Sequence, residues 1–423
     1  MMTLQIKGRL ALMLFLEYFI WGAWYVTVGT WLGQGLHFTG EQIGLVAGTT
    51  AIGAIASPFF IGMIADRLFA TQKVLAVLHA VGAVLLFFAS SRAVFGPIYL
   101  LVLLYAIAYM PTVSLTNSLA FRQMTDPKIE FGPIRMLGTL GWIVAGLLIG
   151  SLKIEATAAP MRLAAAASLI MAVYCLTLPN TPPLGASKNF GVKDIFPSEV
   201  LNLFRERSFA IFALASFLIC IPLQFYYAFT NLYLNEIGVQ NAAGKMTFGQ
   251  MSELLCMLLI PWFFRRLGVK YMLVAGMSAW VLRYVLFAYG NAGAGMWMLL
   301  AGIVMHGICY DFFFVTGQIY IDRKSAAAFR AAAQGTITLI TYGAGMLLGS
   351  WLSGRVVDFY AHTSPDGVVF HQWRPIWLIS AGLSAAVLLL FLLTFSGKEA
   401  NATMSGLHAS GLPAEEMAEG VPL

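Results

Sequence analysis

The feature that most constrains this chain is a series of apolar runs, each about 20 residues long, that recurs along most of its 423 residues. A run of this length crosses the hydrocarbon core of a bilayer as a helix, because a helix satisfies its backbone hydrogen bonds internally. A transmembrane barrel would show short alternating segments instead. The sequence therefore predicts an all-α polytopic membrane protein.

The charged residues are too few for a water-soluble protein. They make up 10% of the chain, and hydrophobic residues make up 59%, whereas soluble domains carry about 25% charged residues. The net charge is +6, but the basic residues are scattered in short loops and form no nucleic-acid patch. The four cysteines lie in apolar stretches without metal-ligand spacing. This composition excludes a soluble enzyme, and we expect no metal, no cofactor and no nucleic-acid partner.

Apolar runs between charged or turn-rich breaks predict twelve transmembrane helices. Their expected limits are residues 9–33, 42–65, 73–90, 97–121, 133–151, 161–178, 208–235, 247–264, 270–288, 296–321, 332–354 and 375–396. Most of the 25 Lys and Arg residues fall in the loops and ends that lie on the same side as the N-terminus. The positive-inside rule then places both termini in the cytoplasm.

The spans fall into two six-helix halves. We expect an N-terminal bundle over residues 1–178, a polar cytoplasmic linker over 179–207, a C-terminal bundle over 208–396, and a disordered cytoplasmic tail over 397–423. This plan resembles the major facilitator superfamily, in which a site between the halves alternates in access. Gly62-x-x-x-Asp66-Arg67, after the second span, resembles the loop motif of that superfamily, although Phe69 and Ala70 depart from it.

Only five ionisable residues of interest lie well inside spans, namely Glu17, Glu253, Asp311, Arg135 and Arg283. Such residues are costly in a membrane and usually face the protein interior for a functional reason. We expect the binding and coupling chemistry of the chain to centre on them.

Two spans in different halves carry polar groups on one helical face. In span five, Arg135, Thr139 and Trp142 share a face and could grip a planar polar ligand by hydrogen bonding and stacking. The alternative is an arginine that snorkels to the membrane boundary. In span seven, Gln224, Tyr227 and Asn231 share a face after Pro222, which would permit bending, and interhelical hydrogen bonding is the alternative there.

Spans eight and ten hold the other carboxylates. Gln250 and Glu253 are three residues apart and suit ribose hydroxyls or a polar base edge, unless Glu253 instead pairs with an arginine such as Arg283. Span ten carries His306, Tyr310, Asp311, Phe314 and Gln318. A buried carboxyl group can load and release a proton, so Asp311 is predicted to couple transport to protons, with structural pairing to a basic neighbour as the alternative.

Glu17 lies near the middle of span one without an evident local partner, and it is the second candidate for a proton carrier. We interpret His79, in span three, as a lone histidine that is simply satisfied or solvated. The chain has no catalytic motif and no nucleotide-binding loop. These observations favour a secondary transporter and not an enzyme.

Several segments resemble the nucleoside:proton symporter family of the major facilitator superfamily. They are Pro133-Ile134-Arg135-Met136-Leu137-Gly138-Thr139-Leu140-Gly141-Trp142-Ile143, Trp21-Gly22-Ala23-Trp24, Tyr109-Met110-Pro111-Thr112, Tyr310-Asp311-Phe312-Phe313 and Ala333-Gln334-Gly335. The likeness covers about residues 8–396, and within the family it is greatest to uncharacterised nucleoside transporters of enteric bacteria.

The resemblance implies a proton-driven nucleoside importer of a bacterial inner membrane that functions as a monomer. The nucleoside-contacting positions of the family would fall on Arg135, Thr139, Trp142, Gln224, Tyr227, Gln250, Glu253, His306 and Tyr310, and the proton-coupling positions on Asp311, Glu253 and Glu17. Trp142, Tyr227 and His306 stand where characterised members carry Phe, Asn and Tyr, and Glu17 replaces a neutral polar residue.

The residues by themselves leave two other functions open. A symporter for a sugar or another small polar solute would use the same carboxylates, arginine and tryptophan, and competition between nucleosides and sugars separates the two. A transport-dead nucleoside sensor is the other alternative, although the tail contains no recognisable signalling module.

Overall fold

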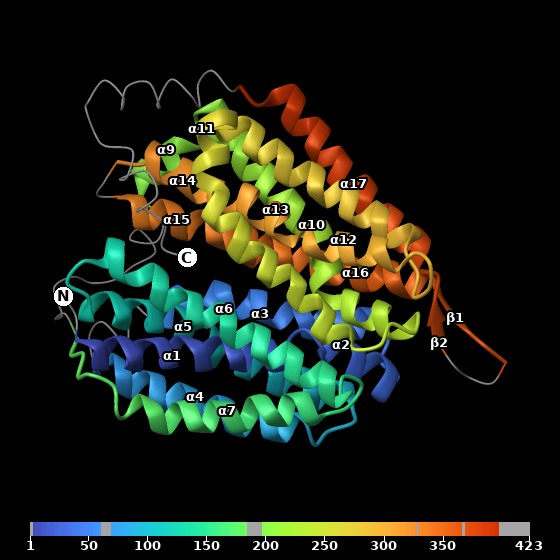
Figure 1. Ribbon diagram of the computed structural model, residues 1–423, viewed down its shortest axis with the longest axis horizontal. Coiled ribbons are helices and arrows are strands. Elements are labelled where there is room, and N and C mark those ends of the chain that lie inside the picture. Colours follow the sequence, from blue (N-terminus) through green and yellow to red (C-terminus); the bar gives the residue numbers. More distant parts are fainter. Residues whose placement is uncertain (1–2, 61–68, 184–196, 327–328, 366–368, 397–423) are drawn as a thin grey trace. The chain divides into compact units, whose positions relative to one another are not determined.

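The computed structural model describes residues 3–60, 69–183, 197–326, 329–365 and 369–396. These residues are almost entirely helical (Figure 1). The Gly62-x-x-x-Asp66-Arg67 motif and the tail over 397–423 lie outside them. Within the described part, one small antiparallel sheet is present, in which β1 (Ala361–Thr363) pairs with β2 (Val369–His371).

The helices agree with the predicted all-α membrane fold of twelve helices. Among the described residues, 8 helices are long and apolar enough to cross a membrane. The longer helices are α1 (Leu4–Trp24), α3 (Gly40–Phe60), α4 (Thr71–Ala89), α5 (Phe95–Gln123), α6 (Pro127–Leu152), α7 (Ala159–Cys175), α10 (Arg207–Glu236), α11 (Ala242–Tyr289), α16 (Met346–Phe359) and α17 (Trp373–Thr394). The shorter ones are α2 (Val28–Thr30), α9 (Ser198–Leu203), α12 (Met296–Val304), α13 (His306–Tyr310), α14 (Thr316–Lys324) and α15 (Arg330–Thr338).

The predicted limits differ from these helices by a few residues. For example, α6 begins at Pro127, whereas we predicted a start at residue 133. Spans eight and nine form the single element α11, which is interrupted at Gly268, where φ is 65° and ψ is 178°. Only glycine adopts this extended conformation with positive φ readily, so Gly268 separates the two spans without a loop.

In the described residues, three membrane-spanning segments contain a π-helical stretch. These stretches are η1 (Trp31–Gly35), η3 (Asp311–Val315) and η5 (Leu339–Gly345). A π turn inserts one residue into the hydrogen-bond ladder, and such turns are frequent at functional sites. The second begins at Asp311, the residue that we predicted to couple transport to protons.

The chain divides into two compact units, which we describe separately. Unit 1 comprises residues 1–190, 224–247 and 346–371, and unit 2 comprises residues 191–223, 248–345 and 372–423. The units therefore differ from the two predicted halves. Residues 224–247 and 346–371 belong to the predicted C-terminal half, but they are part of unit 1 together with residues 1–190. The division into halves at residues 1–178 and 208–396 remains a prediction.

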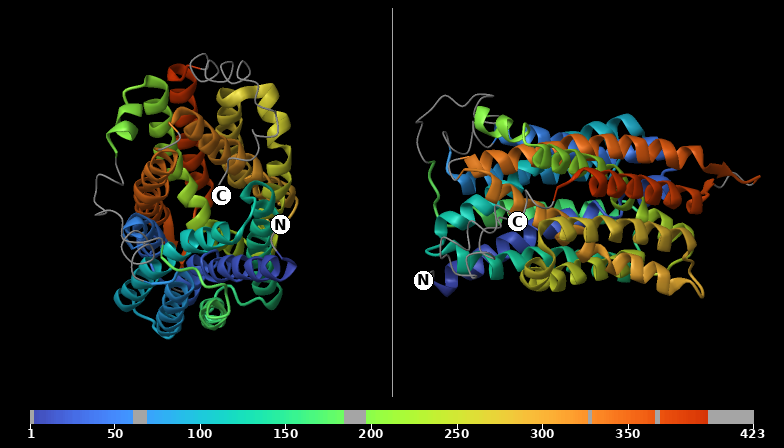
Figure 2. Two further views of the ribbon diagram at one scale, coloured as in Figure 1. Left: turned by 90° about the vertical axis from the view of Figure 1, so that its left-hand side faces the viewer. Right: turned by 90° about the horizontal axis from the view of Figure 1, so that it is seen from above.

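Unit 1 is held together by close helix packing. In it, α1 packs against α6 and α7, and α4 packs against α5 and α7 (Figures 1 and 2). A Cβ atom on Gly141 of α6 would collide with the backbone oxygen of Phe15 in α1. Small residues at such crossings allow backbones to approach closely, which is how membrane helices gain contact without a hydrophobic driving force.

Unit 2 packs largely through aromatic side chains. Tyr284 of α11 stacks on Trp377 of α17 with ring centroids 5.8 Å apart, and Trp280 meets Phe313 edge to face at 5.4 Å. The Tyr284 hydroxyl donates a hydrogen bond of 2.7 Å to the carbonyl oxygen of Pro222 in α10. We expected Pro222 to permit bending, and α10 continues through it as one helix.

Candidate functional site

The predicted face of α6 lies among aromatic residues of α1. The Arg135 guanidinium carbon is 4.1 Å from the ring centroid of Tyr18. Trp142 meets Trp21 edge to face, with centroids 5.7 Å apart. Arg135, Thr139 and Trp142 are all half-buried. The cation–π contact and the indole pair hold planar groups in fixed positions, as stacking on a nucleobase requires.

Two predicted residues of α10 lie in the same unit as this face. The ring centroid of half-buried Tyr227 is 6.2 Å from that of Tyr25 in α1, and the Tyr25 ring is 6.1 Å from that of Trp21. Gln224 is fully buried and donates a hydrogen bond of 2.9 Å to Ser350 Oγ. We refer to Arg135, Thr139, Trp142, Gln224 and Tyr227, with the α1 aromatics that they contact, as the aromatic cluster.

Asn231, the third polar residue on that face of α10, has structural partners. Its Oδ1 accepts a hydrogen bond of 2.5 Å from Thr30, and its Nδ2 donates one of 2.9 Å to Glu155. Glu155 also accepts hydrogen bonds from Asn235 Nδ2 at 2.7 Å and from the Ala243 amide at 3.1 Å. This arrangement fits the alternative of hydrogen bonding between helices.

The remaining predicted contacts come together in unit 2. Glu253 Oε2 is 3.8 Å from His306 Nε2, and the His306 ring stacks on Tyr310 with centroids 5.7 Å apart. A Cβ atom on Gly249 would lie 3.1 Å from that of His306, so the segment of α11 that carries Gln250 and Glu253 packs directly against α13. Glu253, Gln250 and Tyr310 are half-buried, while His306 is buried.

A second tyrosine in this region was missed by the sequence analysis. The hydroxyl of Tyr310 is hydrogen-bonded to that of Tyr342 in η5. The Tyr342 ring also lies 5.6 Å from that of Phe314. The two tyrosines are 32 residues apart and lie on different helical segments. Helical periodicity relates residues within one helix only, so it could not have indicated this contact. We call Gln250, Glu253, His306, Tyr310, Asp311 and Tyr342 the carboxylate cluster.

Asp311 has an unusual environment for a carboxyl group. Its side chain has no exposed surface, and neither carboxyl oxygen has a hydrogen-bond partner within the described part of the chain. The charge on Glu253 acts on it electrostatically. An ionised carboxylate buried without hydrogen-bond donors is very costly, so this arrangement favours the neutral, protonated group.

Arg283, the second arginine inside a span, is fully buried in unit 2. Its Nε donates a hydrogen bond of 3.0 Å to the carbonyl oxygen of Gly302. Its charge acts on His306. The guanidinium therefore contributes to the electrostatic field in which the carboxylate cluster operates.

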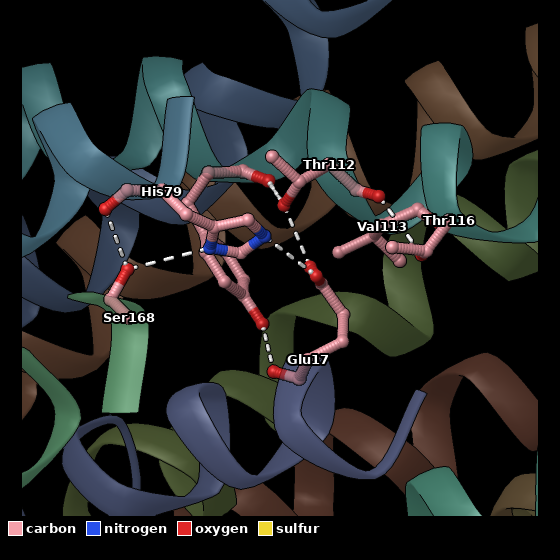
Figure 3. Close-up of polar contacts among 7 residues, drawn as sticks. Glu17, His79, Thr112, Val113, Thr116 and Ser168 are labelled. Atoms are coloured by element: carbon pink, nitrogen blue, oxygen red, sulfur yellow. Dashed lines mark hydrogen bonds and ion pairs between the residues drawn. The ribbon is translucent and has the colours of Figure 1, made fainter. Parts of the chain in front are cut away.

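Glu17 lies in a hydrogen-bonded network of unit 1 (Figure 3). The structure gives it partners that were not evident in the sequence. Its Oε2 lies 3.0 Å from His79 Nε2, and its Oε1 accepts a hydrogen bond of 2.7 Å from Thr112. His79 is correspondingly not a lone histidine. Glu17 and His79 are 62 residues apart, so no spacing within one helix could have paired them.

The fold and these clusters define the class of protein. Apolar membrane helices with buried ionisable residues, and without a catalytic constellation in the described part, are typical of a secondary transporter. Solved structures agree on the fold. A bacterial homologue of the human lysosomal transporter Spinster matches with a TM-score of 0.68 at 15% identity, covering 99% of this chain and 98% of that one.

The sequence profile of the family described as Nucleoside H+ symporter matches residues 3–400. The chain belongs to this family. It is 40% identical to YegT of Escherichia coli (strain K12), a predicted nucleoside transporter, over 93% of this chain and 94% of that protein. It is 33% identical to the xanthosine permease of the same organism, over 93% of this chain and 96% of that one.

A crystal structure of the nucleoside transporter NupG, in a variant form, matches with a TM-score of 0.87 at 31% identity. The match covers 92% of this chain and 100% of that chain. The resemblance found in the sequence is thus confirmed at the level of the family and the fold. The comparisons do not test the individual site residues, which remain predictions.

Proposed function

We propose that this protein imports nucleosides into bacterial cells by proton symport, with alternating access between its two halves. The single observation that carries the proposal is Asp311. This carboxyl group is fully buried at the start of a π turn, within the influence of Glu253 and without a hydrogen-bond partner in the described residues. A group of this kind binds and releases protons as its surroundings change.

Nucleoside contacts are assigned to both clusters. In the aromatic cluster, Arg135, Thr139, Trp142, Gln224 and Tyr227 offer a guanidinium, a hydroxyl, an amide and stacking surfaces. In the carboxylate cluster, Gln250, Glu253, His306 and Tyr310 offer hydrogen-bonding groups for a ribose or a base edge. Aromatic stacking combined with a few directional hydrogen bonds is the chemistry that a nucleobase demands.

Coupling is assigned to Asp311 and Glu253, with Glu17 as a further carrier. In this mechanism, protonation from outside removes the charge that would otherwise oppose burial of the carboxyl groups. Protonation and nucleoside binding together permit the outer side to close, and the inner side then opens. The proton and the nucleoside leave towards the cytoplasm, and the empty carrier returns.

The setting of this cycle follows from the distribution of Lys and Arg and from the family. We propose a location in the bacterial inner membrane, both termini in the cytoplasm, and a functional monomer. The bilayer, a nucleoside and protons are then the partners that transport requires.

Uptake of radiolabelled uridine and adenosine into proteoliposomes tests the function directly. We expect accumulation when an inward proton gradient is imposed and only equilibration without it. Unlabelled nucleosides should compete with the labelled ones, whereas maltose and sucrose should not. Sugar competition of equal strength would favour a sugar symporter, and binding without any uptake would favour a sensor.

A further inference from the structure

The proton-coupling role proposed for Glu17 of α1 can be made more specific from its pairing with His79 of α4, to which no role has been assigned (Figure 3). The relative exposures of the two residues are 0% and 1%. Glu17 Oε2 and His79 Nε2 lie 3.0 Å apart. In the described part of the chain, no Lys or Arg pairs with this carboxyl group. His79 is the basic side chain that pairs with it there.

The hydrogen bonds around His79 define which ring nitrogen is the donor. Ser168 Oγ donates its one proton to the backbone oxygen of His79 at 2.9 Å. It also lies 3.4 Å from His79 Nδ1. The shorter contact takes the serine proton, so Ser168 Oγ is assigned as the acceptor at Nδ1. We therefore assign a hydrogen to His79 Nδ1.

This assignment requires a proton between Glu17 and His79. If Nδ1 carries the only ring hydrogen, Nε2 is an acceptor and Glu17 must be a neutral acid that donates to it. If Nε2 is also protonated, an imidazolium donates to an ionised carboxylate. Both arrangements contain one proton more than an ionised glutamate beside a neutral histidine. The geometry is thus that of a site with one proton bound, which we call the loaded form.

Among the described residues, the neighbouring side chains do not supply a cation that pairs with Glu17. The negative charge of its carboxylate is therefore neutralised by the bound proton. From α5, the Tyr109 hydroxyl donates to the Glu17 backbone oxygen at 2.5 Å, and Tyr105 lies within the electrostatic influence of Glu17. From α7, Cys175 is also within that influence. From α6, the Arg135 guanidinium lies over the ring of Tyr18. Loss of the proton would leave a buried negative charge.

We propose that the Glu17–His79 pair is a second proton-binding site, which takes up one proton from outside and releases it inside in every transport cycle. This proton is additional to the one carried by the carboxylate cluster. The inference rests on the proposed symport function. The pair binds one proton between Glu17 Oε2 and His79 Nε2. It releases the same proton when its surroundings change.

The number of protons carried per nucleoside tests the proposal. Nucleoside uptake by radiotracer and proton uptake by an entrapped pH-sensitive dye are measured in the same proteoliposomes. The double variant Glu17→Gln/His79→Gln should carry one proton fewer per nucleoside than the wild type. The control Glu199→Gln/His362→Gln alters an exposed glutamate and an exposed histidine and should leave the ratio unchanged.

An unchanged ratio in the double variant would overturn this inference while leaving symport intact. A wild type that takes up nucleosides without protons would overturn the proposed function as well, so the two failures are distinguishable.

Ser168→Ala supplies a test that keeps both titratable groups. Ser168 accepts the hydrogen bond from His79 Nδ1 and so favours the loaded form. Its removal should weaken proton binding and lower the pH of half-maximal uptake. A pH profile identical to that of the wild type would assign the pair a purely structural role.

Discussion

Glu17 and Asp311 are both fully buried carboxyl groups, but the protein surrounds them differently. Both oxygens of Glu17 have partners, Thr112 and His79, whereas neither oxygen of Asp311 has one among the described residues. The hydrogen bonds of Glu17 are therefore satisfied without any rearrangement of its surroundings. Asp311 can ionise only if its surroundings change, because a bare buried carboxylate is too costly. The difference indicates that conformational change is tied most directly to the proton on Asp311.

The largest expected effect is that of Asp311→Asn. Moving one charge across 100 mV supplies about 2.3 kcal/mol, which corresponds to roughly 50-fold accumulation. If Asp311 carries one of the coupled protons, the variant should lose this factor of uphill accumulation and retain nucleoside binding, measured as uptake and binding on one preparation.

Asp322→Asn is the matched control for this variant. Asp322 follows on the same span and is paired with Arg330 at 3.5 Å, so its loss should not affect coupling. Undiminished uphill uptake by Asp311→Asn would remove Asp311 from the mechanism.

The second prediction concerns stability and sharpens the contrast between the two carboxyl groups. Glu17→Leu leaves His79 and Thr112 without their partner, and breaking a buried pair costs about 3–5 kcal/mol. Asp311→Leu removes a group without hydrogen bonds and should cost much less. Thermal unfolding in detergent should show a clearly lower midpoint for Glu17→Leu only. Equal losses in the two variants would refute the contrast between their environments.

A smaller effect is expected for Arg135→Ala in the aromatic cluster. Loss of the guanidinium should weaken nucleoside binding about tenfold, or about 1.4 kcal/mol, in equilibrium binding measurements. Arg135→Lys should not restore it, because an ammonium group lacks the planar fork. Arg162→Ala, at an exposed position, is the control. Unchanged affinity would mean that Arg135 has only a structural role.

The smallest effect is expected for Tyr342→Phe. This change removes the hydrogen bond between the hydroxyls of Tyr310 and Tyr342 and keeps the ring against Phe314. One hydrogen bond is worth about 1 kcal/mol, so nucleoside affinity should fall about fivefold, with the proton ratio unchanged. A changed proton ratio would instead make Tyr342 part of the coupling machinery.

The fold was predictable because it depends on local sequence. Apolar runs of membrane length predict the helices, and helical periodicity places Arg135 and Trp142 on one face. The partners of these residues depend on tertiary packing and were not predictable. Glu17 meets His79 and Thr112 only because α1, α4 and α5 pack in one unit. The hairpin over residues 361–371 was also missed, since its strands have three residues each.

The most direct test of the account is the pH change that a nucleoside itself causes. Uridine or adenosine is added to proteoliposomes that start without a proton gradient, and internal pH is recorded with an entrapped dye. We expect acidification of the interior with wild-type protein and with Asp322→Asn, and less acidification per nucleoside with Asp311→Asn, which keeps only the proton of the Glu17–His79 pair. Nucleoside entry without acidification in the wild type, or equal acidification in Asp311→Asn, would contradict the account.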